Sequence, residues 1–294
     1  MLKAITRRIA LAGLAASLPV RAEVPALRIG AIADCQYTDE PDNGQRLYRL
    51  SPAKLREAVA VFAQEKVDFA VHLGDFIDKD WASFDALLPI TWTLDRPWHF
   101  VLGNHDLLVE DARKNQVAAK LGMPARYYSF SRNGWLFVVL DGNDVSSYGW
   151  PEGSPELAAS LRLHADRYPN ASLWSGAIGD AQLRWLDTVL TDADALGLKA
   201  MLLCHFPLWP DNPNNLWNAA EVMALIARHS SVKIWLDGHN HDGNYGVRDG
   251  IHYLNLRGML DTTMTSYAIL DLKSDRIEVR GFGREQDFTL PLRD

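Results

Sequence analysis

The apolar run Trp98-His99-Phe100-Val101-Leu102 leads directly into the polar block Gly103-Asn104-His105-Asp106. A short apolar run that ends in glycine and polar residues is typical of a buried strand followed by a loop. Four other apolar runs of the chain end in the same way, and their polar blocks are Asp34-Cys35-Gln36, Gly74-Asp75 with Asp78, Cys204-His205, and Gly238-His239-Asn240-His241. Carboxylate, amide and imidazole groups gathered at strand ends indicate a hydrolytic site with two metal ions.

The rest of the chain alternates strand-like runs with helical patterns. Strands are expected at residues 27–33, 67–73, 98–102, 127–130, 135–140, 199–204, 232–236, 251–256, 267–272 and 276–280. A helix is expected to open at Ser51-Pro52, and others at residues 81–92, 107–124, 180–195 and 216–229. This alternation predicts an α/β layered fold, in which sites gather beyond the carboxyl ends of the strands. The C-terminal strands are expected to complete a second sheet.

Residues 1–22 have the pattern of a secretory signal peptide. A basic start is followed by an apolar region over residues 9–20, and Val20-Arg21-Ala22 places small residues at positions −3 and −1 of a cleavage site. Residues 6–11 also resemble a twin-arginine export signal. We therefore expect export, to the periplasm of a bacterium. The alternative is a poorly packed N-terminal helix or a membrane anchor.

Residues 23–294 are expected to form a single catalytic domain, because no linker rich in Pro, Gly or Ser interrupts them. Residues 1–22 hold four basic and no acidic residues, so their removal lowers the net charge from −7 to −11. An acidic surface repels a polyphosphate backbone, which argues against a nucleic-acid partner. A small phosphorylated substrate remains compatible, because metal ions supply local positive charge. The sequence has no run of 18 apolar residues, so no membrane-spanning helix is predicted.

The two cysteines, Cys35 and Cys204, each stand beside a candidate ligand. Neighbouring side chains on a strand point to opposite faces, so both thiols are expected to face away from the metals and into packing. Buried free thiols are the preferred interpretation. A disulfide between them, formed in an oxidising compartment, is the alternative.

Taken together, the five blocks resemble the calcineurin-like metallophosphoesterase superfamily; the matching residues are Asp34-x-Gln36, Gly74-Asp75-x-x-Asp78, Gly103-Asn104-His105-Asp106, His205 and Gly238-His239-x-His241. The resemblance implies a four-layer α/β/β/α sandwich that binds two divalent metals. It assigns the first metal to Asp34, Gln36, Asp75 and His241. It assigns the second metal to Asp75, Asn104, His205 and His239, so that Asp75 bridges the two.

The resemblance also implies roles for three residues that bind no metal. His105 is expected to act as an imidazolium that stabilises the transition state or protonates the leaving oxygen. Asp106 is expected to hold the ring of His105 and to raise its pKa. Asp78 is expected to orient a neighbouring ligand from outside the metal sphere.

Gln36 departs from the superfamily, most of which has His at this position. An amide oxygen is a harder ligand than imidazole, so Gln36 favours manganese or magnesium over zinc. The segment Ile32–Tyr37 is similar to the manganese-dependent ADP-ribose/CDP-alcohol diphosphatases, which carry Asp-x-Gln. Six further segments are similar to the same diphosphatases: Arg46-x-Tyr48-Arg49, Asp144-Val145-Ser146, Gly176–Gly179, His205–Leu208, Trp217-Asn218-x-x-Glu221-Val222 and His241-Asp242-Gly243-x-Tyr245. This resemblance implies two manganese ions, with iron, zinc or magnesium as alternatives.

The same resemblance implies that a metal-bound hydroxide cleaves the P–O–P bond of a nucleoside diphosphate linked to a sugar or an alcohol. Arg46 and Tyr48, in a long polar loop over residues 38–51, could reach the second phosphate or its substituent. A solvated arginine and a packed tyrosine are the alternative. Two other functions stay open: a broad-specificity periplasmic phosphomonoesterase or phosphodiesterase, and a metal-binding scaffold without catalytic activity. The sequence does not define the oligomeric state.

Overall fold

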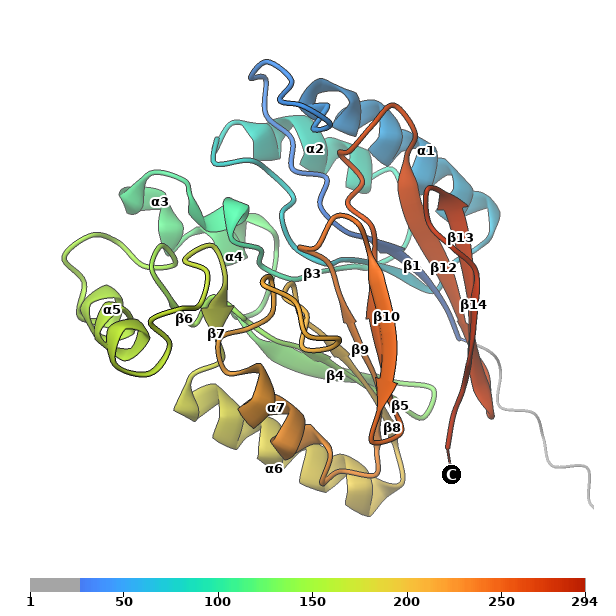
Figure 1. Cartoon of the computed structure of the whole chain (residues 1–294). Helices are drawn as coiled ribbons and strands as arrows, with labels where there is room; N and C mark the ends of the chain where they lie inside the picture. The colour runs from blue at the N-terminus through green and yellow to red at the C-terminus, as the bar shows by residue number, and fades with distance from the viewer. Residues whose placement is uncertain (1–26, 294) are drawn as a thin grey trace, which may run out of the picture.

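The computed structural model of the chain describes residues 27–293 and contains two six-stranded sheets packed face to face (Figure 1). The order of the first sheet is β14-β13-β12-β1-β2-β3, and the order of the second is β10-β11-β9-β8-β5-β4. The first comprises β1 (Leu27–Ile32), β2 (Phe69–His72), β3 (Trp98–Phe100), β12 (Ser266–Leu272), β13 (Arg276–Gly283) and β14 (Phe288–Pro291). The second comprises β4 (Tyr128–Arg132), β5 (Trp135–Val139), β8 (Lys199–Leu203), β9 (Val232–Asp237), β10 (Asn244–Arg248) and β11 (Ile251–Asn255).

Helices cover the outer face of each sheet (Figure 1). The first sheet is covered by α1 (Ser51–Gln64) and α2 (Ser83–Thr91), and the second by α6 (Asp180–Leu196) and α7 (Ala219–Ile226). The predicted α/β/β/α sandwich is therefore confirmed. The remaining elements are η1 (Tyr48–Leu50), η2 (His105–Leu107), α3 (Asp111–Lys114), α4 (Val117–Lys120), α5 (Pro155–Arg167), and the strand pair β6 (Val145–Ser146) and β7 (Gly176–Ala177). Within residues 27–293, no helix has the length and apolar character that crossing a membrane requires.

Two hydrophobic cores hold the layers together, and β5 contributes to both. Phe137 and Val139 pack into the core shared with the first sheet, α1 and α2. Leu136 and Val138 pack into the core beneath α6 and α7. Alternate side chains of a strand point to opposite faces, so one fully buried strand joins both cores.

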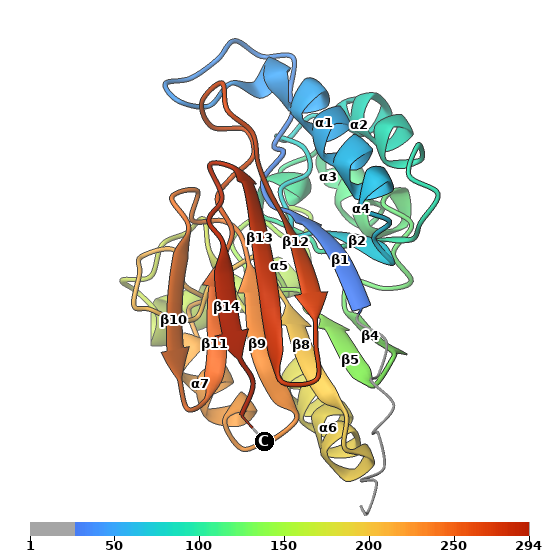
Figure 2. The same cartoon turned by 90° about the vertical axis from the view of Figure 1, so that its right-hand side faces the viewer.

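Two expectations about the elements were wrong, and one helix was not predicted. Residues 107–124 do not form one helix, because Leu107 and Val109 are both buried and a helix cannot turn residues two apart to one side. The helix α5 was not predicted; Ser154 caps its first turn, and Ser160 is its only buried residue. The C-terminal strands do not complete a single sheet. Figure 2 shows β12, β13 and β14 continuing the first sheet from β1, whereas β10 and β11 extend the second.

Candidate metal centre

The predicted metal ligands all follow the carboxyl ends of strands, and backbone hydrogen bonds draw these strand ends together. The N–H of Gln36, which follows β1, donates to the carbonyl of Asp75 after β2 at 2.7 Å. In the second sheet, the N–H of Gly238 donates to the carbonyl of His205 at 3.0 Å. All seven predicted ligands therefore lie at one end of the sandwich, where the two sheets meet.

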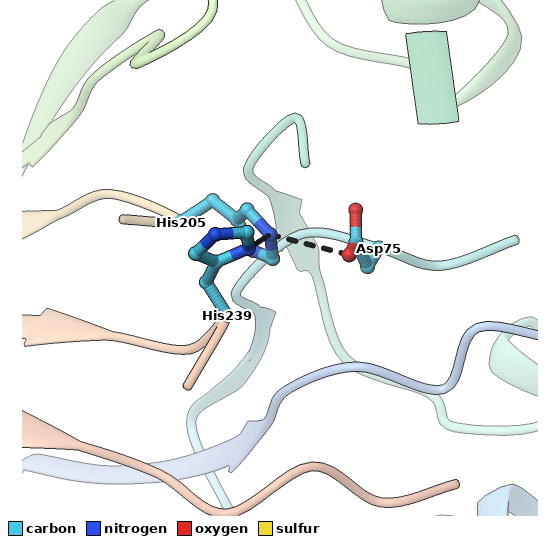
Figure 3. Close-up of side chains that lie close together, drawn as sticks. All are labelled: Asp75, His205 and His239. Carbon is cyan, nitrogen blue, oxygen red and sulfur yellow. Dashed lines mark hydrogen bonds and ion pairs between the residues drawn. The ribbon is translucent and has the colours of Figure 1, made fainter. Parts of the chain in front are cut away.

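Asp75, His205 and His239 form a compact cluster of potential ligand atoms (Figure 3). The Nε2 atom of His205 lies 3.3 Å from Oδ2 of Asp75 and 3.2 Å from Nδ1 of His239. The amide oxygen of Asn104 lies 3.2 Å from the same Nε2 atom. These four residues are the set expected for the second metal.

The ring orientation of His205 leaves a lone pair on Nε2. Its Nδ1 atom lies 2.8 Å from the carbonyl oxygen of Leu73, and a carbonyl only accepts, so Nδ1 carries the proton of the neutral ring. The Nε2 lone pair then faces a carboxylate oxygen, an amide oxygen and a second imidazole nitrogen. Lone pairs that converge in this way repel one another unless a cation lies among them. The residues present therefore fit a divalent metal.

A second group of unpartnered atoms surrounds Asp34. Its Oδ1 atom lies 3.6 Å from Nε2 of His241, and neither side-chain polar atom of the buried Gln36 has a hydrogen-bond partner. Oδ1 of Asp34 also lacks a partner. Buried polar atoms without partners are costly, so they mark a site that a ligand completes. Asp34, Gln36 and His241 are the residues expected for the first metal, beside the shared Asp75.

The backbone at these positions is strained. Asp34, Gln36, Asp75 and His239 have φ angles of +55°, +43°, +53° and +66°. Residues other than glycine rarely adopt a positive φ angle, and each residue held there destabilises the fold by roughly 1–3 kcal/mol. Strain concentrated on four predicted ligands indicates that the surrounding fold holds them in place for a function.

Two glycines allow the strand ends to approach so closely. A Cβ atom at Gly74 would lie 2.5 Å from Nδ1 of His205, and one at Gly103 would lie 2.1 Å from Oδ1 of Asp75. Gly74 also has a φ angle of +92°. The glycines of the Gly-Asp and Gly-Asn blocks are therefore required by close packing around the ligands.

The charges of the cluster shift the pKa values of its histidines. Burial alone would lower the pKa of His205, but the carboxylate of Asp75 outweighs burial and raises that pKa to about 9. Burial would also lower the pKa of His241, but Asp34 and Asp261 raise it to about 10. Burial and the neighbouring His205 hold the pKa of His239 well below its usual value. Without metal, protons on His205 and His241 partly neutralise the carboxylates, and a bound cation would take their place.

The structure corrects the expected partner of His105. Its Nδ1 atom is hydrogen-bonded to Oδ1 of Asp78, so Asp78 orients the ring and Asp106 does not. The backbone N–H of His105 donates to Oδ1 of Asp75 at 2.8 Å, which places His105 beside the carboxylate that is expected to bridge the metals. The side chain of His105 is 20% exposed. It can therefore meet a substrate from the solvent side.

Asp106 instead organises the loops that carry the ligands. Its two carboxylate oxygens accept four backbone hydrogen bonds of 2.9–3.1 Å, from the N–H groups of Asp75, Phe76, Ile77 and Gly103. Burial and the charge of Asp75 raise the pKa of Asp106 to about 7. Its contacts are those of a structural residue that fixes the Gly-Asp and Gly-Asn loops relative to each other.

Arg46 and Tyr48, the predicted substrate contacts, lie in different environments. Tyr48 is buried, so the packed alternative describes it. The backbone of Arg46 forms a β-bridge with Asp261, whose carboxylate lies 3.1 Å from Nδ1 of His241. Arg46 is thereby held close to the first metal group, and its contact with a substrate stays a prediction.

Asp261 is a residue of the candidate site that the motifs did not predict. It orients His241 through the ring nitrogen that faces away from Asp34. It belongs to none of the ligand blocks, so no sequence signal identified it. The structure agrees with the preferred interpretation of the cysteines as buried free thiols. Cys35 lies in the first core and Cys204 in the second.

Comparison with known proteins agrees with this geometry. The family model for calcineurin-like phosphoesterases matches residues 27–243. A manganese-dependent ADP-ribose/CDP-alcohol diphosphatase from Arabidopsis thaliana is 30% identical, over 90% of this chain and 97% of its own. A protein of the same name from Xenopus tropicalis is 30% identical over 93% and 96%. A crystal structure of a dimetal phosphatase from Danio rerio superposes with a TM-score of 0.84 at 28% identity, covering 92% of this chain and all of its own. The chain therefore belongs to the calcineurin-like phosphoesterase family, as a metal-dependent hydrolase.

Proposed function

We propose that this protein is a manganese-dependent diphosphatase that cleaves the P–O–P bond of ADP-ribose, CDP-alcohols or related nucleoside diphosphates. The observation that carries the proposal is the pair of ligand groups around Asp75, one of which contains the amide of Gln36. An amide oxygen suits manganese better than it suits zinc. The relatives named as diphosphatases support the substrate class.

The residues present fit two divalent ions. One ion would be held by Asp34, Gln36 and His241. The other would be held by Asn104, His205 and His239, and Asp75 would contribute to both sites. When bound, the ions would supply positive charge against the phosphate and lower the pKa of the attacking water. The protein itself keeps the ligands rigid, because backbone hydrogen bonds and Asp106 fix the loops from which they project.

His105 would act on the leaving oxygen. Asp78 occupies Nδ1, so the ring exchanges protons through Nε2. A water oxygen bonds to one phosphorus, the bond from that phosphorus to the bridging oxygen breaks, and the bridging oxygen leaves with the other phosphate. His105 stabilises the charge on that oxygen or protonates it. ADP-ribose would yield AMP and ribose 5-phosphate, and a CDP-alcohol would yield CMP and the phosphorylated alcohol.

A substrate panel tests the proposal. ADP-ribose, a CDP-alcohol, p-nitrophenyl phosphate and bis-p-nitrophenyl phosphate are each incubated with the protein and Mn, Mg, Zn or Fe. Release of AMP or CMP, fastest with Mn, is the expected result. Turnover confined to the nitrophenyl esters would replace the proposal with a broad-specificity phosphoesterase, and no turnover with any metal would favour a scaffold.

We also propose that the protein is exported, on the pattern of residues 1–22. These residues, with the predicted cleavage after Ala22 and the twin-arginine motif, lie outside the described residues 27–293. N-terminal sequencing of protein secreted from an expressing bacterium would test export. A periplasmic protein that begins at Glu23 is expected, and a cytosolic protein that begins at Met1 would contradict it.

A further inference from the structure

Lys54 of α1 is a buried lysine whose ammonium group forms no ion pair with a carboxylate of residues 27–293. It is 4% exposed, and its Nζ atom lies within hydrogen-bond distance of four consecutive backbone carbonyls. These belong to Met259, Leu260, Asp261 and Thr262, at 2.8, 3.0, 3.2 and 2.7 Å. An ammonium group has only three protons, so the four carbonyls share them around one cation.

The loop over residues 259–262 depends on such a cation. Four carbonyl dipoles that point toward one place repel one another unless a positive charge lies between them. The loop also ends in strain, because Thr262 has a φ angle of +57°, which a β-branched side chain rarely adopts. A hydrophobic residue in place of Lys54 would remove the donor that Lys54 supplies to the carbonyls of Met259, Asp261 and Thr262. The carbonyl of Leu260 would keep a second donor, the N–H of Leu47 at 3.2 Å.

The same loop holds two ligands of the first metal group. The N–H of Leu260 donates to the carbonyl of Asp34 at 3.0 Å, so the loop lies against the ligand at the end of β1. The carboxylate of Asp261 orients His241. Within residues 27–293, no hydrogen bond or ion pair joins residues 259–262 to Asn104, His205 or His239. Lys54 therefore contacts a loop that serves one metal and not the other.

We propose that Lys54 is a positioning residue for the first metal: by binding the carbonyls of residues 259–262, it fixes Asp261 and through it His241. The inference rests on the proposed metal-dependent function, but it concerns metal affinity and is tested without a substrate. A ligand whose orienting partner is lost binds metal more weakly, typically by about 10–100-fold.

Manganese titration of the metal-free protein by calorimetry tests the proposal. Two binding steps are expected for the wild type. Asp261→Asn identifies the step that belongs to the first metal, because it weakens the bond to His241 directly. Lys54→Met is expected to weaken that step by about 10–100-fold and to leave the other unchanged.

A double variant and a control separate positioning from general destabilisation. If Lys54 acts through Asp261, Lys54→Met combined with Asp261→Asn weakens the step by less than the product of the two separate effects. Val59→Ala, a buried apolar change on the same helix, is expected to lower stability and to leave both steps unchanged. If Lys54→Met does not fold, Lys54→Gln keeps a side-chain N–H donor and is expected to show a smaller selective loss.

Three results would overturn the proposal. These are equal weakening of both steps in the Lys54 variants, no weakening of either step, and independent effects of Lys54→Met and Asp261→Asn. Absence of substrate turnover in the wild type would instead count against the proposed function, and would leave the titration result in force.

Discussion

Replacing Gly103 with alanine tests whether close packing around Asp75 sets the geometry of the metal centre. The added Cβ atom would lie 2.1 Å from Oδ1 of Asp75 and 2.2 Å from its backbone nitrogen. Cβ atoms essentially never approach other heavy atoms below 3.0 Å, so the two loops must separate by roughly 0.9 Å. The contact includes backbone, so no rotation of a side chain can relieve it.

The expected loss follows from that displacement. Asp75 is the proposed ligand of both metals, and misplacing a catalytic group by about 1 Å can lower turnover by about 10²-fold. Gly103→Ala is therefore expected to lower kcat by roughly 10²-fold and to weaken both manganese binding steps. Turnover of the best substrate of the panel and a manganese titration measure the two effects.

Gly30→Ala is the matched control. Gly30 lies within β1, and a Cβ atom there would lie 2.6 Å from the ring of Phe62, a comparable clash away from the ligands. It is expected to lower the free energy of unfolding, measured with urea, and to leave kcat and manganese affinity of the folded protein unchanged. Wild-type turnover and manganese affinity in Gly103→Ala would refute the reasoning, and so would losses in Gly30→Ala equal to those in Gly103→Ala.

Three further predictions follow from the site and its surroundings. His105→Ala is expected to lower kcat by roughly 10²–10⁴-fold with unchanged metal content. Asp78→Asn added to it should cause no further loss, because Asp78 acts through the ring of His105. Kinetics and metal analysis check both, and metal loss in His105→Ala would contradict its place outside the metal sphere. Gln36→His is expected to tighten the first metal and shift the preference away from manganese, and an unchanged metal profile in titrations would speak against Gln36 as a ligand. Burial would raise the pKa of Asp194, but hydrogen bonds from Ser231 and His229 lower it. The ionised carboxylate of Asp194 therefore stabilises the fold at neutral pH, and this stabilisation is lost as pH falls below about 4. The gap in unfolding free energy between wild type and Asp194→Asn should narrow from pH 7 to pH 3, and a constant gap in urea titrations would contradict this sign.

The sequence predicted the layers and the gathering of the ligands because both depend on local patterns. An apolar run that ends in a polar block marks a strand end, and strand ends of an α/β fold meet at one edge. The order of the blocks along the chain then identified the family. The helix α5 was not predicted, although Leu157 and Leu161 stand one turn apart in its sequence; in the structure Ser160 is its only buried residue.

The separate roles of Asp78 and Asp106 could not be predicted from the sequence, for a different reason. Asp106 directly follows His105 and Asp78 belongs to the Gly-Asp block, and spacing alone does not show which carboxylate faces the ring. The outcome depends on η2, which turns the side chain of Asp106 toward the N–H groups of the Gly-Asp loop.

Lys54 and Asp261 illustrate contacts that no motif predicts. They are 207 positions apart in the chain, and they meet because β12 pairs with β1 and brings the preceding loop against α1. Residues that support metal ligands from such a distance become visible only when the fold is known.

Anomalous scattering from crystals grown with manganese would test the two-metal centre most directly. Two manganese peaks about 3.5–4 Å apart are expected, one among Asp34, Gln36 and His241 and the other among Asn104, His205 and His239, with Asp75 between them. A single peak, or manganese bound away from Asp75, would contradict the proposed centre.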